Sequence, residues 1–307
     1  MKSKKGFEFS FAWLFAILVG AVIIFLAVYG TTKFIKTGRY QLDTVTAKQL
    51  SILFEPLEVG LASGKSNIVE LRDETKIYNE CDERGSFGQH LISLSTESGI
   101  GKKWQEPGAE ISVPNKYIFS SSMEQGKRVF FFSKAFEIPW KVSEIIFLTT
   151  KEYCFVDAFE EVEEEVDGLG LQNIKLENCT EDDTRVCFGS GTGCDIRVRG
   201  GYEEGFVDKG EESVFYTEGL IYAAIFSDKE VYECNVKRLM KRLIQQALLY
   251  KDEAEFLSEK CESLPSADLI QLINTAKSLN NSEGLLLVRQ ISEEVNGQNE
   301  VAECSLW

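Results

Sequence analysis

The chain has 307 residues, with 49 acidic side chains against 33 basic ones, and its formal net charge at pH 7 is −16. Residues 1–39 hold six basic side chains and one acidic one, a net of +5, which leaves −21 for the remainder. A domain this acidic repels the phosphates of nucleic acid and of anionic lipid, which argues against a nucleic-acid-binding protein.

Residues 9–32 are 24 residues without a charged side chain, directly after a basic head that contains Lys2, Lys4 and Lys5. A helix of this length crosses a bilayer with some tilt. A cleaved signal peptide has an apolar region of only about 7–15 residues, followed by a small-x-small cleavage site. We therefore predict that residues 1–32 are a basic head and a retained transmembrane helix. The alternative, a buried core helix, is disfavoured because such long helices usually keep a polar face.

The charges that flank this helix do not decide its orientation, because Lys33, Lys36 and Arg39 nearly balance the basic head. The cysteines favour one orientation, since their number is even and none lies in the apolar segment, as expected for disulfides in an oxidising compartment. The eight candidates are Cys81, Cys154, Cys179, Cys187, Cys194, Cys234, Cys261 and Cys304. We therefore predict a single-pass cell-membrane protein with a cytoplasmic N-terminus and an extracytoplasmic bulk.

Spacing suggests some of the disulfide pairs without fixing the connectivity. Cys187 is expected to pair with Cys194 across a glycine-rich segment, or one of the two with Cys179. At least one pair is expected among the three cysteines of the C-terminal region, Cys234, Cys261 and Cys304.

The chain beyond the membrane is predicted to change from helix to strands. Residues 33–57 continue the helical period and form a predicted helical stalk, either continuous with the span or broken at Gly38, and ended by Pro56. Residues 58–227 consist of short β-branched and aromatic segments between turn residues, the pattern of an antiparallel sheet or small sandwich. The predicted strands are 68–71, 89–95, 110–113, 117–120, 129–133, 142–148, 153–156, 174–176, 185–188, 195–198, 213–216 and 220–226, with an acidic helix at 158–166.

Residues 228–307 return to a helical period, with apolar stripes that predict helices at 228–258, 266–279 and 285–295. Gly297 is the expected C-cap of the last helix, although residues 285–288 would also suit a strand. The predicted fold class is α+β, with an N-terminal transmembrane helix, an extracytoplasmic antiparallel β-rich region and a C-terminal helical region packed on it.

Several segments have a superficial likeness to chemical sites. The glycine-rich segment 187–194 is not followed by Lys-Ser or Lys-Thr and precedes a predicted strand, so it indicates a tight turn rather than a phosphate loop. The closest cysteine spacings are seven and eight residues and the single histidine, His90, is distant, which disfavours both zinc and a Cys–His catalytic pair. The acidic run at 160–167 lacks the ligand order of a calcium loop. No catalytic, cofactor or metal residue is therefore predicted.

Two surface features remain. One is a basic helix face made by Lys237, Arg238, Lys241 and Arg242. We predict that this face is solvated, or that it pairs with the acidic helix of the same chain or of a neighbouring copy. The other is a pair of acceptor motifs for N-glycosylation, which place possible sites at Asn178 and Asn280.

The segment before the apolar helix resembles the class III signal of type IV prepilins and their archaeal relatives. Basic residues, then Gly6, Phe7 and Glu8, lead directly into the helix, and the resemblance covers about the first 35–50 residues. It implies cleavage after Gly6 on the cytoplasmic side, with the helix then packing into a filament core. Many members carry Glu five residues after the cut, where Phe11 stands here. The length and cysteine content resemble a minor or tip subunit more than a major pilin.

These features lead to a prediction of a membrane-anchored cell-surface protein, a pilin-like subunit with a structural or adhesive role. The alternative is an uncleaved single-span anchor that displays a disulfide-bonded ligand- or protein-binding domain. An extracytoplasmic enzyme is not expected, because no motif supports one. The expected partners are the lipid bilayer and pilin-like subunits or further copies of the chain, with no nucleic acid and no cofactor.

Overall fold

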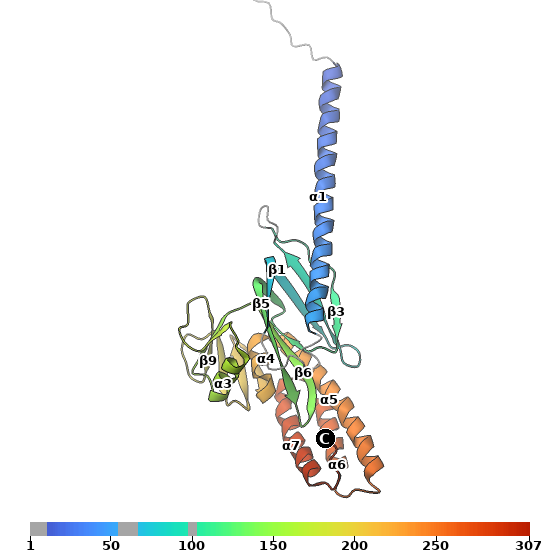
Figure 1. The fold of residues 1–307 in the computed structure, drawn as a ribbon, viewed down its shortest axis with the longest axis vertical. Coiled ribbons are helices and arrows are strands. Elements are labelled where there is room, and N and C mark those ends of the chain that lie inside the picture. Colours follow the sequence, from blue (N-terminus) through green and yellow to red (C-terminus); the bar gives the residue numbers. More distant parts are fainter. Residues whose placement is uncertain (1–10, 55–66, 98–102) are drawn as a thin grey trace, which may run out of the picture.

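The computed structural model describes residues 11–54, 67–97 and 103–307 and has a mixed α/β fold. A long N-terminal helix projects from a body made of two sheets and a set of C-terminal helices (Figure 1). The body gathers around the C-terminal end of the long helix, while the N-terminal part of that helix stands apart from it.

Helix α1 (Phe11–Leu53) is one unbroken helix of 43 residues, so it is about 65 Å long at 1.5 Å per residue. It passes through Gly38 without the break that the sequence allowed. Its N-terminal part is long and apolar enough to cross a membrane, and none of that apolar window is buried in the protein. The predicted transmembrane helix and stalk are therefore one element. Its exposed apolar segment supports membrane anchoring.

The first sheet has the order β3-β2-β1-β5-β6-β4 and is antiparallel except where β4 pairs with β6. Its strands are β1 (Asn67–Asp82), β2 (Gln89–Thr96), β3 (Ile111–Pro114), β4 (Ile118–Phe119), β5 (Met123–Glu137) and β6 (Lys141–Thr149). β1 and β5 are much longer than the predicted segments, because their outer halves carry charged residues that the strand pattern does not include.

The second sheet has the order β12-β11-β10-β9-β7-β8. Its strands are β7 (Tyr153–Val156), β8 (Ile174–Lys175), β9 (Thr184–Phe188), β10 (Ile196–Gly200), β11 (Glu204–Lys209) and β12 (Glu212–Thr217). The prediction of antiparallel pairing is wrong for three of the five strand pairings in this sheet, since β7, β8, β9 and β10 pair in parallel. Helix α3 (Glu160–Leu169) supplies the crossover from β7 to β8 that parallel pairing requires.

Alternating residues of the central strands face two different cores. On β5 and β6, Phe132 and Phe147 belong to the larger core, which the second sheet and the C-terminal helices share. Phe131 and Ile146 belong to a smaller core beneath α1. The first sheet is therefore a wall between α1 on one face and the C-terminal helices on the other.

The C-terminal region is helical, as predicted. Its helices are α4 (Ile221–Phe226), α5 (Lys229–Leu257), α6 (Ser266–Ser278) and α7 (Leu285–Val301), with 3-10 turns at Glu218–Leu220 and Ser282–Gly284. The predicted strand at 220–226 is wrong, because a fully buried apolar run has no periodicity that separates helix from strand. α7 continues past Gly297, so that residue is not the predicted C-cap.

Candidate functional site

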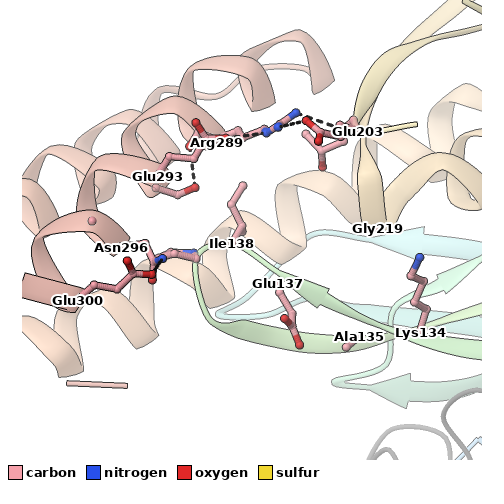
Figure 2. A pocket seen from close by; sticks show the side chains of 14 residues that line it. Lys134, Ala135, Glu137, Ile138, Glu203, Gly219, Arg289, Glu293, Asn296 and Glu300 are labelled. Carbon is pink, nitrogen blue, oxygen red and sulfur yellow. Dashed lines mark hydrogen bonds and ion pairs between the residues drawn. The ribbon is translucent and has the colours of Figure 1, made fainter. Parts of the chain in front are cut away.

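A cleft of about 770 Å³ lies between α7 and the hairpin formed by β5 and β6 (Figure 2). One wall comes from the end of β5 and the turn that follows it, with Lys134, Glu137 and Ile138. The other comes from α7, on which Arg289 and Glu300 lie on one face of the helix. The cleft is therefore lined by charged side chains from segments about 150 residues apart in the sequence.

Both cations of the cleft are already neutralised by carboxylates. Arg289 donates to the carboxylates of Glu203 at 2.7 Å, Glu204 at 3.1 Å and Glu293 at 3.0 Å, and these hydrogen bonds raise the pKa of Arg289. Lys134 forms an ion pair with Glu165, which belongs to α3. Neither cation is left with an unmatched positive charge for an anionic ligand.

The remaining polar groups of the cleft are mainly acceptors. Within the part of the chain that the structure describes, neither Glu137 nor Glu300 belongs to an ion pair. Glu300 accepts a hydrogen bond from the Asn296 amide at 2.8 Å, and Asn296 in turn accepts from the Trp307 indole at 3.2 Å. The cleft therefore has a net negative charge and suits a cationic group.

The cysteines form four disulfides, and no described cysteine is free. The local prediction of Cys187 with Cys194 is confirmed, and Gly189 and Gly193 in the turn between them have positive φ as expected. The expected pair in the C-terminal region is Cys261 with Cys304. The remaining bonds join Cys154 to Cys179 and Cys81 to Cys234. The last bond connects β1 with α5 across 153 residues, which no local spacing could indicate.

A buried polar network lies beside that long-range disulfide. His90 on β2 is fully buried, with Nδ1 2.7 Å from Asn79 Oδ1 and Nε2 2.8 Å from Asn235 Oδ1. The Ile118 amide also donates to Nε2, at 3.1 Å. Burial, and then the nearby charge of Arg238, lower the pKa of His90 to about 3.

Arg238 is the residue that sequence reasoning misplaced. The predicted solvated basic face included it, but its side chain is completely buried. It donates to the carbonyl oxygens of Phe87 and Lys116 and to Asn235 Oδ1, each at 2.9 Å, and lies over the Tyr117 ring. Desolvation lowers its pKa to about 10, so it stays charged at neutral pH. The sequence did contain a sign that Arg238 is buried, because it lies seven residues after the buried Val231 and so falls within the apolar face of α5.

The other predicted sites are the processing segment and the two glycosylation motifs. Gly6, Phe7 and Glu8 lie outside the described residues. Asn178 is exposed in a left-handed turn, whereas the acceptor motif of Asn280 includes Ser282, whose hydroxyl is buried and bonded to Glu233. The geometry of the second motif does not suit modification of the folded chain.

α1 carries two apolar faces in the part that follows its membrane-length apolar segment. One holds Ala47 and Leu50 against the first sheet, where Asp43 accepts a hydrogen bond from Thr96 at 3.1 Å. The opposite face is exposed and carries apolar side chains together with the polar Gln49, with Phe34 84%, Leu42 58% and Ile52 58% accessible. At 100° per residue these three side chains lie within about 80° of one another. Together with Val45, which lies on the same face and is also exposed, they form a stripe on the side away from the sheet.

Comparisons with protein-family models, with curated proteins and with solved structures each find no match to this chain. Its function has to be inferred from the residues and their placement.

Proposed function

We propose that this protein is a membrane-anchored cell-surface subunit that assembles with copies of itself or with pilin-like neighbours through α1. The observation that carries the proposal is the apolar stripe of α1, defined by Phe34, Leu42, Val45 and Ile52, which continues past the membrane span and faces away from the body. A stripe of this kind in water favours burial against a partner.

The geometry of the anchor supports parallel association. A bilayer holds every copy in the same orientation, so the stripes of two neighbouring copies lie at the same height above the membrane. From Asp43 onward the far face of the helix is covered by the first sheet, which leaves the stripe exposed for a neighbour. Gly38 lies among the stripe residues with open space around it, and a small residue there allows two helices to approach closely.

Two further features support the location and the processing of the subunit. Four disulfides suit an oxidising, extracytoplasmic compartment for the body. The prepilin-like segment at Gly6 and Phe7 suits removal of the basic head on the cytoplasmic side. Intact mass spectrometry of the native protein tests the processing step. A chain that begins at Phe7 is expected, and a population that begins only at Met1 would contradict it.

Photo-crosslinking tests the assembly interface directly. A photoreactive amino acid at Leu42 lies in the stripe, and the matched control at Lys36 is also exposed but lies on the sheet side of the helix. Illumination of cells is expected to produce crosslinked oligomers from position 42 and few or none from position 36. Equal yields at the two positions, or monomer alone at both, would refute assembly through the stripe.

The cleft supports a second candidate function, the display of a domain that binds a cationic ligand. Spermidine is a suitable probe, because it matches the open carboxylates of Glu137 and Glu300 in charge. Calorimetric titration of the full chain in micelles is expected to show binding that the double substitution Glu137→Gln/Glu300→Gln weakens at least fivefold. Glu259→Gln is the control, because Glu259 is exposed and does not line the cleft. Equal binding by all three proteins would exclude the cleft.

A further inference from the structure

The disulfide between Cys81 and Cys234 differs from the other three in its exposure. Each of the others contains a buried cysteine, namely Cys154, Cys187 or Cys261. Cys81 and Cys234 are both partly exposed, although their bond joins the first sheet to α5. Both sulfur atoms are therefore in residues that solvent reaches.

A buried cation lies next to one sulfur of this bond. One terminal nitrogen of the Arg238 guanidinium is 4.0 Å from Cys81 Sγ. Its other hydrogen bonds go to uncharged oxygens, and no carboxylate of the described residues forms an ion pair with it. His90, the cross-strand neighbour of Cys81, stays neutral at physiological pH. Arg238 thus keeps its charge in the interior without a contacting anion.

Reduction of the bond would supply the missing anion. A positive charge near a sulfur stabilises the thiolate over the thiol, and a more stable thiolate leaves faster in disulfide exchange. Both cysteines have acidic neighbours in the sequence, Glu80 and Asp82 beside Cys81 and Glu230 and Glu233 near Cys234, and Lys237 and Arg238 follow Cys234 by one helical turn. The contact of the Arg238 guanidinium with Cys81 Sγ is what assigns Cys81 as the leaving group and Cys234 as the sulfur that is attacked.

The surface around the bond is open to a small reactant. A pocket of about 330 Å³ beside the bond is lined by Cys81, Asn79, Ser122 and Val231 and by the acidic residues Glu80 and Glu230, while Cys234 does not line it and is reached through its own partly exposed surface. The acidic lining repels thiols that carry negative charge and admits neutral or cationic ones.

We propose that Cys81–Cys234 is a thiol–disulfide exchange site that reacts with an uncharged or basic dithiol. The incoming thiolate attacks Cys234 Sγ, a mixed disulfide forms, and the electron pair of the broken S–S bond goes to Cys81, which leaves as a thiolate beside Arg238. The second thiol of the partner, after losing its proton to solvent, attacks the mixed disulfide, becomes oxidised to a disulfide and releases Cys234, which takes a proton from solvent. Two electrons pass from the dithiol to the protein.

The order of reduction in the native full chain tests the proposal. The protein in micelles is treated with dithiothreitol, trapped with an alkylating reagent over time and mapped by mass spectrometry. Cys81–Cys234 is expected to open at least tenfold faster than the other three bonds. If any other bond opens first, or if all four open together, the proposal is wrong.

Two further measurements test the role of the charges. In the reduced protein, the pH dependence of alkylation should give Cys81 a lower thiol pKa than Cys234, and the reverse order would overturn the assigned leaving group. At equal thiolate concentration, cysteamine should open the bond faster than 2-mercaptoethanol, and mercaptoacetate more slowly.

Arg238→Gln should slow opening severalfold while the Cys187–Cys194 bond in the same sample keeps its rate. Unchanged opening in that variant would remove Arg238 from the mechanism, and the first two measurements stand if the variant does not fold.

Discussion

Mild acid should destabilise this protein through His90, which takes up a proton more readily in the unfolded chain than in the folded one. The ring is fully buried, and burial together with the charge of Arg238 lowers its pKa from 6.5 to about 3. The unfolded chain therefore binds a proton below about pH 6.5 that the folded chain does not accept until about pH 3. The contribution of His90 to stability is complete above pH 6.5 and is lost progressively as the pH falls toward 3.

The size of the effect follows from the two pKa values. Between about pH 7.5 and about pH 5 the unfolded state gains nearly one proton relative to the folded state. At about 1.4 kcal/mol per pH unit, the free energy of unfolding falls by about 2 kcal/mol over that interval. His90 is the only histidine in the chain, and unperturbed carboxyl groups titrate mainly below this range. The loss can thus be assigned to one side chain.

Urea unfolding of the full chain in micelles, followed by tryptophan fluorescence, measures this free energy at each pH. The matched variant His90→Gln keeps a polar group that hydrogen-bonds but does not titrate. It is expected to be less stable at pH 7.5 but to lose little further stability by pH 5. A wild-type free energy that is constant over the interval, or a variant with the same slope as the wild type, would refute the explanation.

Two further predictions concern packing. Gly88→Ala should destabilise the protein by about 2 kcal/mol or more, because its backbone has a positive φ and a Cβ there would lie 2.4 Å from the Asp82 carbonyl oxygen. Gly210 also has a positive φ but has open space around it, so the control variant Gly210→Ala should cost about 1 kcal/mol. Equal losses in thermal denaturation would contradict the steric reason. Phe147→Ala should lower the free energy of unfolding by about 3–5 kcal/mol, because Phe147 is only 1% exposed. Phe256 is 78% exposed, so Phe256→Ala should cost under about 0.5 kcal/mol. Similar urea midpoints for the two variants would contradict the burial of Phe147 in the core.

Local patterns in the sequence predict where most helices and strands lie, but not which of them pair or pack together. Uninterrupted apolar character predicted the N-terminal helix, and apolar stripes predicted α5, α6 and α7, because helical period and burial are properties of neighbouring residues. The parallel pairing of β7 with β9 depends on a crossover whose direction no local pattern encodes. The sequence predicts a strand where α4 lies, because each of its residues is apolar and buried and no helical period is visible.

The polar interior was the least predictable part. Arg238 counts as a surface residue by type, but inside the protein it donates to the carbonyl oxygens of Phe87, just before β2, and Lys116, just before β4, and to Asn235 on α5. The cleft depends in the same way on the meeting of α7 with a hairpin about 150 residues earlier. Both sites arise from tertiary contacts between distant segments, which composition and spacing do not specify.

The unbroken course of α1 has a mechanical consequence. The helix runs from its apolar end to its contact with the first sheet without a hinge, and it is about 65 Å long. A change of about 10° in the tilt of its apolar end would sweep the far end through about 11 Å, taking the helix as a rigid rod with a rise of 1.5 Å per residue. Because α1 has no break, a tilt of its apolar end displaces the end that contacts the first sheet, and the body moves with it.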